Sequence, residues 1–231
     1  MDSRSPKVVG SFGSSRDLRA SPLATVQESC DIAEIRLDLL LAECGKIDPA
    51  TWAHLMDFPL LFTARRGDEG GAGSLDAATR MKLLMEVLDD AAMIDIEVAS
   101  IPEMASILDE IRDGKIPWIA SCHDFEKLPD LTALKAAEAR AVEAGAAVFK
   151  AAARLGSPAD LARLAEFQLA HREIAVSTMG MGPLAPVSRL LCAQSGSVLN
   201  YGYLGSTPTA PGQWDSALLK TTISRLAPLG A

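Results

Sequence analysis

The sequence predicts a single-domain α/β protein, a (β/α)8 barrel of the TIM type, on three observations. Short β-type runs alternate with longer helical runs along the whole chain. Eight such β-type runs recur at roughly regular intervals, which is the number a closed barrel needs. The chain of 231 residues has the length of such a barrel as one domain, so residues 1–231 are expected to form a single domain.

The β-type runs read, in chain order, KVVGSF near 7, AEIRLDLL near 33, PLLFTAR near 59, AMIDIEV near 92, PWIASCH near 117, AAVFKAA near 146, EIAVSTM near 173 and SVLNYGYL near 197. An open, doubly wound sheet is the main alternative. That fold usually has fewer units and a G-x-G-x-x-G turn after its first strand, which the segment GSFGSSRD lacks.

Helical periodicity separates the strands, most clearly in three segments. Residues 75–90 repeat apolar positions three and four apart, and residues 131–145 end on a glycine, as helix C-termini often do. Residues 157–170 open with Ser157 as a predicted N-cap and Pro158 at the first helical position.

Composition and charge exclude several classes of function. The net charge of -8 argues against a nucleic-acid partner and against an anionic membrane surface. The N-terminal segment MDSRSPKVVG has no apolar export core, and no window is long and apolar enough to span a membrane. The four cysteines are scattered without a C-x-x-C pair, so reduced thiols are expected rather than disulfides or a zinc site. The prediction is a cytoplasmic protein.

Several predicted strands carry charged residues where a parallel strand should be uniformly apolar. Period-two spacing puts Glu34, Arg36 and Asp38 on one face of their strand, which we expect to face the barrel interior. The same spacing joins four further pairs: Thr63 and Arg65, Asp95 and Glu97, Ser121 and His123, Val148 and Lys150. A single charged residue at a strand end is usually solvated, but several together indicate an active site at the carboxyl-terminal rim.

Lys150 stands in the apolar segment AVFKAAARLG, where its sequence neighbours offer no carboxylate. Burial and nearby guanidinium groups would lower its pKa from the usual value of about 10.4. A neutral amine can attack a carbonyl and form an imine, the chemistry of Schiff-base enzymes. The alternative is a lysine whose side chain extends from a strand end into water.

His123 is the predicted acid–base partner, because it ends an apolar strand and imidazole exchanges protons near neutral pH. His54 and His171 are interpreted as structural or surface residues. No metal role is expected for His123, since no cluster at ligand spacing accompanies it. The loop RRGDEGGAGS lacks the ending of a P-loop and is interpreted as a glycine-rich turn that brings Arg65 and Glu69 to a ligand.

Six motifs in order connect the chain to a known family: EIRLD, FTARRGDEGG, SCHDF, FKAA, MGPLAPVSRL and TAPGQW. Over essentially its whole length the chain resembles the type I 3-dehydroquinate dehydratases, Schiff-base lyases of the shikimate pathway and aromatic amino-acid biosynthesis. The resemblance implies a cofactor-independent barrel enzyme that converts 3-dehydroquinate to 3-dehydroshikimate as a homodimer.

The resemblance also implies roles for ten residues. Lys150 matches the amine that condenses with the substrate ketone, His123 the general acid and base, and Glu69 the carboxylate beside that histidine. Arg189 matches the residue that binds the substrate carboxylate. The remaining matches are substrate-binding residues: Ser11, Glu34, Arg36, Arg65, Thr209 and Gln213.

Three departures from the family pattern are visible. Thr209 stands where the family usually has serine, and Ala185 stands where it usually has glycine. The first strand begins almost at the N-terminus, so the N-terminal hairpin of family members is expected to be short or absent. Two other functions fit part of the pattern: another lysine Schiff-base barrel such as an aldolase, and an inactive barrel that binds a small carboxylate.

Overall fold

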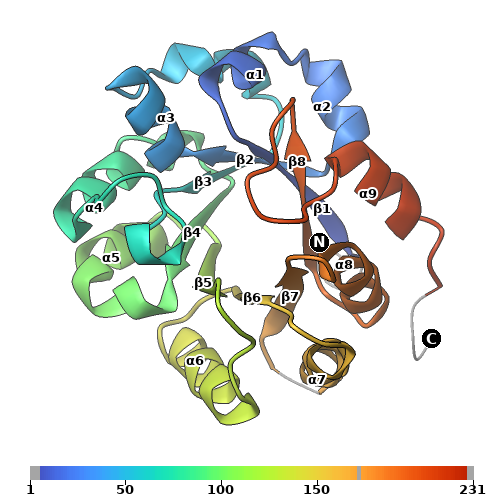
Figure 1. Cartoon of the computed structure of the whole chain (residues 1–231). Coiled ribbons are helices and arrows are strands. Elements are labelled where there is room, and N and C mark those ends of the chain that lie inside the picture. Colours follow the sequence, from blue (N-terminus) through green and yellow to red (C-terminus); the bar gives the residue numbers. More distant parts are fainter. Residues whose placement is uncertain (1–5, 171–172, 228–231) are drawn as a thin grey trace.

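Eight parallel strands form a nearly closed ring with helices outside it, in a computed structural model that describes residues 6–170 and 173–227 (Figure 1). The strands are β1 (Lys7–Phe12), β2 (Ile32–Arg36), β3 (Leu60–Thr63), β4 (Met93–Glu97), β5 (Trp118–Asp124), β6 (Val148–Arg154), β7 (Ala175–Met181) and β8 (Leu199–Leu204). Their order in the sheet is β7-β6-β5-β4-β3-β2-β1-β8. Where β7 and β8 meet, the Val198 amide donates to the Val176 carbonyl at 3.1 Å. The predicted (β/α)8 barrel is therefore confirmed, and the open sheet is excluded.

The helices cover the outside of the ring. They are α1 (Ser15–Ala20), α2 (Leu23–Ser29), α3 (Leu37–Cys44), α4 (Ala77–Met85), α5 (Ala105–Asp113), α6 (Leu131–Glu143), α7 (Pro158–Leu169), α8 (Ala185–Gln194) and α9 (Ser216–Ile223). Short 3-10 helices are η1 (Pro49–Thr51), η2 (Ala53–Leu55), η3 (Gly67–Glu69), η4 (Leu88–Asp90) and η5 (Val98–Met104). None of the helices in the described part of the chain has the length and apolarity needed to cross a membrane.

The helical segments predicted from periodicity are confirmed with one difference. Ser157 caps α7 by accepting a hydrogen bond from the Asp160 amide, and Gly145 follows α6 at a φ of 77°. The segment 75–90 is divided into α4 and η4. Asp76 is the N-cap of α4: its side chain accepts from the Thr79 amide at 2.8 Å, and the helix begins at the next residue.

The core has two parts. The larger cluster joins the outer faces of the strands to the helices. The smaller one contains only strand residues and a neighbouring loop residue, and it lies inside the barrel, where it extends to the floor of the pocket described below. Its members include Val9, Leu61, Ile119, Val148 and Leu199. Two residues further along the same strands, on the same face, the interior carries Ser11, Thr63, Ser121, Lys150 and Tyr201. The barrel interior thus changes from apolar to polar within one strand period.

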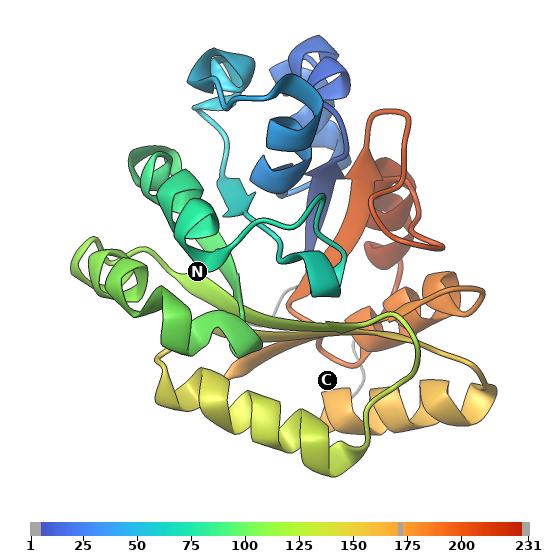
Figure 2. The same ribbon diagram turned by 60° about the vertical axis from the view of Figure 1, so that its left-hand side comes forward.

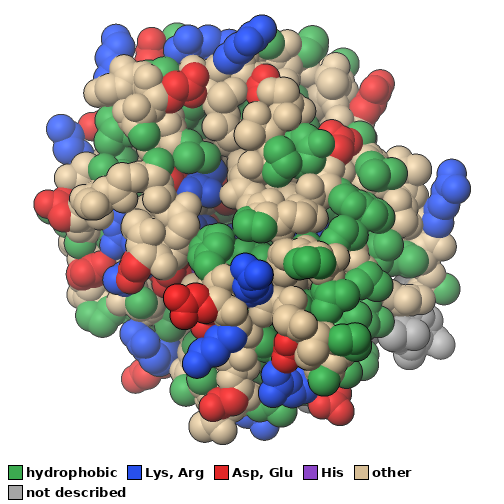
Figure 3. All heavy atoms as spheres, in the orientation of Figure 1, with side chains coloured by type: hydrophobic (Ala, Val, Ile, Leu, Met, Phe, Trp, Pro, Cys, Tyr) green, Lys and Arg blue, Asp and Glu red, His purple; other side chains and the backbone are tan. Residues whose placement is uncertain are grey.

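The loops after β3 and β8 lie at the same end of the strands (Figure 2). On the outside, hydrophobic side chains gather over α8 and α9, where Val187 and Leu218 are half-exposed (Figure 3). The hairpin that family members place before the first strand would fall in residues 1–5, which lie outside the described residues.

Candidate active site

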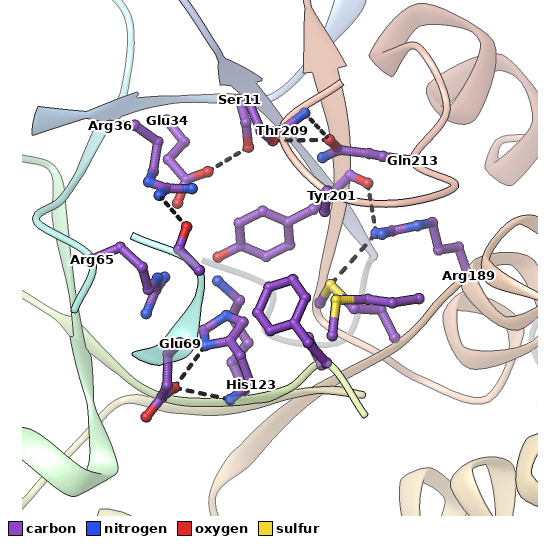
Figure 4. Close-up of a pocket in the computed structure, with 17 residues that line it drawn as sticks. Ser11, Glu34, Arg36, Arg65, Glu69, His123, Arg189, Tyr201, Thr209 and Gln213 are labelled. Atoms are coloured by element: carbon purple, nitrogen blue, oxygen red, sulfur yellow. Dashed lines mark hydrogen bonds and ion pairs between the residues drawn. The ribbon is translucent and has the colours of Figure 1, made fainter. Parts of the chain in front are cut away.

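A pocket opens at the carboxyl ends of the strands, between the loops after β3 and β8 (Figure 4). All ten residues predicted from the sequence line it: Ser11, Glu34, Arg36, Arg65, Glu69, His123, Lys150, Arg189, Thr209 and Gln213. They come from β1, β2, β5, β6, α8 and the loops after β3 and β8. The barrel thus brings together residues as far apart in the chain as Ser11 and Gln213.

Lys150 points from β6 into this pocket and is 3% exposed, which excludes a side chain that extends into bulk water. Its Nζ lies 2.9 Å from Asp95 Oδ2 and 4.1 Å from the centre of the Tyr201 ring. Burial lowers the pKa of Lys150, and the positive charge of Arg65 adds to this effect against the opposing charge of Asp95. The expected low pKa is confirmed in direction, but the carboxylate partner was not expected.

Glu69 orients His123 through two hydrogen bonds to one carboxylate oxygen. The backbone N–H of His123 donates to Oε2 at 2.9 Å, and Nδ1 lies 2.9 Å from the same oxygen. When Glu69 is ionised, Oε2 only accepts, so Nδ1 carries the proton and donates it, and Nε2 is left as the basic nitrogen. Burial, followed by the charges of Arg65 and Lys150, lowers the pKa of His123, which favours the neutral ring. Burial raises the pKa of Glu69 to about 7.

Arg65 carries a buried positive charge beside the lysine. Its Nη1 lies 2.9 Å from both Asp95 Oδ1 and Glu97 Oε1, and it donates to Ser121 Oγ at 2.7 Å. Although burial opposes it, the charges of Arg65 and Lys150 lower the pKa of Asp95, so this carboxylate stays ionised. The loop that follows Arg65 turns sharply: a Cβ on Gly71 would lie 2.1 Å from the Arg65 carbonyl oxygen, so only glycine fits.

Glu34 occupies the β2 side of the pocket with both carboxylate oxygens bonded. The hydroxyl of Ser11 donates to Oε2, and that of Thr63 donates to Oε1 at 2.8 Å. This arrangement follows from the strand register, in which Ser11 of β1 stands beside Glu34 of β2. Glu34 is therefore buried and held in one position in the pocket by these two hydroxyl groups.

The expected position of Asp38 on the strand is wrong. β2 ends at Arg36, and Asp38 lies in the first turn of α3. There it accepts from Arg36 Nε at 2.8 Å and Nη2 at 2.7 Å, and also from the backbone amides of Arg65 and Ala72. A carboxylate in a first helical turn is favoured by the helix dipole. Asp38 thus positions Arg36 and the loop after β3 rather than lining the pocket.

Arg189, on α8, is buried and has no carboxylate partner among the described residues. Its Nη1 donates to the Tyr201 carbonyl at 2.8 Å and contacts Met179 Sδ at 3.4 Å, while Nε has no hydrogen-bond partner. Burial lowers its pKa to about 10, so the guanidinium stays charged at neutral pH. A buried, unpaired cation that lines a pocket is a site for an anionic group.

Thr209 and Gln213 belong to the loop after β8, which covers the pocket. The amide and hydroxyl of Thr209 both donate to Gln213 Oε1, at 2.9 and 2.8 Å. Threonine thus offers here the same hydroxyl donor as the serine that is usual in the family. Gly212 has a φ of 75°, and a Cβ there would lie 2.4 Å from the Gly182 carbonyl oxygen. The same Cβ would lie 2.9 Å from the methyl group of Ala185. Ala185, which stands where the family usually has glycine, therefore packs beside the loop.

Two residues of the pocket region were missed as site residues. Asp95 had been expected to face inward, and period-two spacing could have ranked it higher; Tyr201 in VLNYGYL gave the same signal as a strand residue facing the barrel. His54 is exposed and contacts the Ser21 carbonyl, as expected of a surface residue, whereas His171 lies outside the described residues.

The fold and the site together define the class: a (β/α)8-barrel enzyme with its pocket at the carboxyl-terminal rim. Residues 12–227 match the family model of type I 3-dehydroquinase. The chain therefore belongs to the type I 3-dehydroquinase family, whose enzymes are hydro-lyases.

Individual relatives agree with this assignment. The chain is 31% identical over 220 residues to the 3-dehydroquinate dehydratase of Haloarcula marismortui, covering 91% of this chain and 93% of that protein. It is 34% identical over 189 residues to the bifunctional 3-dehydroquinate dehydratase/shikimate dehydrogenase of Arabidopsis thaliana, covering 79% of this chain and 30% of that protein. The crystal structure of the 3-dehydroquinate dehydratase from Geobacillus kaustophilus HTA426 matches with a TM-score of 0.82 at 25% identity, covering 95% of this chain and 90% of that one.

Proposed function

We propose that this chain dehydrates 3-dehydroquinate to 3-dehydroshikimate, a step of the shikimate pathway, through an imine formed on Lys150. The observation that carries the proposal is a buried lysine of lowered pKa that shares one pocket with His123 and the unpaired Arg189. Family membership supports the overall reaction, and the local chemistry of the pocket supports the route.

Imine formation is the first chemical step. The neutral Nζ of Lys150 attacks the substrate ketone, and the resulting carbinolamine loses water to give a protonated imine. This cation replaces the ammonium beside Asp95, whose ionised carboxylate lies 2.9 Å from the nitrogen. The ion pair therefore stabilises the cation on which the later steps depend.

Proton removal and loss of hydroxide follow. His123 takes the proton next to the imine carbon, and the electron pair moves into the imine to form a neutral enamine. The enamine then expels the hydroxyl group, to which His123 returns the proton, so that water leaves. Hydrolysis of the new imine releases the product and regenerates the lysine. The carboxylate of Glu69 keeps the imidazole in the tautomer that this exchange needs.

The other predicted residues hold the substrate. We assign its carboxylate to the guanidinium of Arg189, because no described residue neutralises this charge. The substrate hydroxyls would then meet the opposite side of the pocket, where Glu34, Arg36 and Arg65 lie, with Ser11 fixing Glu34. The loop after β8 would lie over the ligand, with its shape held by the hydrogen bond from Thr209 to Gln213.

Reductive trapping tests the route. The protein is incubated with 3-dehydroquinate and sodium borohydride and then digested for mass spectrometry. We expect the peptide that contains Lys150 to gain the mass of the reduced ligand, and the conjugated enone absorbance of the product to rise when borohydride is omitted. Lys150→Ala should lose both signals, while Lys135→Ala, at an exposed lysine of α6, should keep both. Turnover without an adduct on Lys150, or full activity of Lys150→Ala, would refute the proposal.

We also propose that the chain forms a homodimer, as the family resemblance implies. Light scattering on the purified protein tests this, and a mass of one chain at micromolar concentration would contradict it.

A further inference from the structure

Tyr201 is a residue of the pocket to which the reaction described above gives no role. It lies on β8 and is 4% exposed. Its carbonyl accepts the hydrogen bond from Arg189, and the face of its ring lies 4.1 Å from Lys150 Nζ. Figure 4 shows the ring between these parts of the site, with its hydroxyl pointing away from Arg189 and toward the side of Glu34 and Arg65.

The hydroxyl of Tyr201 is buried without a hydrogen-bond partner among the described residues. Burying an unpaired hydroxyl group costs free energy, and buried tyrosines usually find a partner for it. Phenylalanine would fill the same space and face the lysine without that cost. Burial and the charges of Asp95 and Glu34 raise the pKa of Tyr201. The phenol therefore keeps its proton and can donate a hydrogen bond.

The chemistry of the proposed substrate supplies the missing partner. On the cyclohexane ring of 3-dehydroquinate, the carboxylate and the two adjacent secondary hydroxyls lie on opposite sides. If Arg189 binds the carboxylate, these hydroxyls reach the far side of the pocket, toward which the tyrosine hydroxyl points. One of them is on the carbon next to the ketone that reacts with Lys150.

We propose that Tyr201 is a further substrate-binding residue of this site. Its hydroxyl donates a hydrogen bond to the substrate hydroxyl adjacent to the ketone, and its ring face stabilises the cationic nitrogen of the imine. The inference rests on the proposed function, because it needs a polyhydroxylated ketone bound at Lys150. It makes the pocket selective for that hydroxyl, since an analogue without it would leave the buried phenol unpaired.

Tyr201→Phe separates the two contributions, because it removes the hydroxyl and keeps the ring. We expect kcat/KM for 3-dehydroquinate to fall about tenfold, as for the loss of one hydrogen bond to a substrate. The melting temperature should stay the same or rise, because an unpaired buried group is removed. Borohydride should still trap an adduct on Lys150. Tyr201→Leu, which also removes the ring face, should in addition slow the trapping.

Tyr203→Phe is the matched control, since Tyr203 is the other tyrosine of the chain, lies on the same strand and does not line the pocket. It should leave kcat/KM and trapping unchanged. A kcat/KM of Tyr201→Phe within twofold of the wild type, or a fall in its melting temperature of several degrees, would overturn the inference, because the hydroxyl would then lack a substrate partner or have one inside the protein. If the wild-type protein forms no adduct on Lys150, the proposed function itself fails, whatever the tyrosine variants do.

Discussion

Lys150 and Asp95, which are 55 positions apart in the chain, form an ion pair of 2.9 Å inside the barrel. The other carboxylate oxygen of Asp95 lies 2.9 Å from Arg65 Nη1, so one buried anion holds two buried cations. Burial and the charge of Arg65 lower the pKa of Lys150, the charge of Asp95 raises it, and the lowering effects together are larger.

Asp95→Asn should weaken the fold and make Lys150 less basic. Two buried cations would lose their anion, so we expect the free energy of unfolding to fall by about 3 to 5 kcal/mol. Without the negative charge the pKa of Lys150 falls further, and the pH midpoint of borohydride trapping should move to lower pH. Urea unfolding and the pH dependence of trapping measure the two effects.

Asp109→Asn, in an exposed pair with Arg112, is the control and should change stability by less than about 0.5 kcal/mol. A midpoint that stays in place or rises would contradict this account.

Glu69 should make stability depend on pH in the direction opposite to most carboxylates. Its folded-state pKa of about 7 lies above the usual 4.5, so the folded protein binds this proton more tightly than the unfolded chain. Its contribution is present below pH 4.5 and is lost as the pH rises to 7, by a total on the order of 3 kcal/mol. His123, with a lowered pKa, acts in the opposite sense.

The difference between the wild type and Glu69→Gln isolates this effect, because both keep His123. We expect the free energy of unfolding of the wild type to decline relative to the variant between pH 4.5 and 7, as measured by urea unfolding at several pH values. A difference that is constant over this range would show that Glu69 titrates normally.

Arg189→Met should lose substrate affinity and keep stability. The guanidinium has no carboxylate partner in the described structure, so its removal breaks no ion pair and relieves a buried charge. Because the loss of charge-assisted hydrogen bonds to a carboxylate is costly, we expect KM to rise about 100-fold with a smaller change in kcat. Steady-state kinetics and thermal unfolding test both parts. Arg163→Met, at an exposed position of α7, is the control. A large loss of stability without a change in KM would mean that Arg189 is structural.

Arg80→Met should destabilise the barrel from outside the pocket. Arg80 of α4 donates to Glu97 Oε2 and Glu103 Oε1, both at 2.7 Å, and to Ser100 Oγ at 3.0 Å. Glu97 in turn pairs with Arg65, so the change would leave this buried carboxylate with one of its two arginine partners. We expect a loss of about 3 kcal/mol in urea unfolding. Arg112→Met, in an exposed pair, provides the comparison, and equal effects of the two variants would refute the argument.

The sequence by itself determined the barrel and most of the pocket. The alternation of strand and helix predicts the fold because each buried strand must be covered by a helix before the next strand can pair beside it. Period-two spacing predicts that Glu34, Asp95 and Lys150 face inward, since side chains alternate strictly along a strand. The family motifs then singled out Glu69, Arg189 and Gln213, which lie outside the strands.

Only the tertiary structure decided which of these charges meet. The partner of Lys150 is invisible to local spacing, because the barrel closes β4, β5 and β6 side by side and brings Asp95 to the lysine from another strand. Asp38 was misplaced because the strand pattern continues past Arg36, whereas hydrogen bonds from Arg36 and two loop amides hold it in a helical turn. The unpaired hydroxyl of Tyr201 is likewise a property of packing. Sequence periodicity fixes the direction of each side chain, but distances between strands, and with them pKa values and partners, arise only when the ring is assembled.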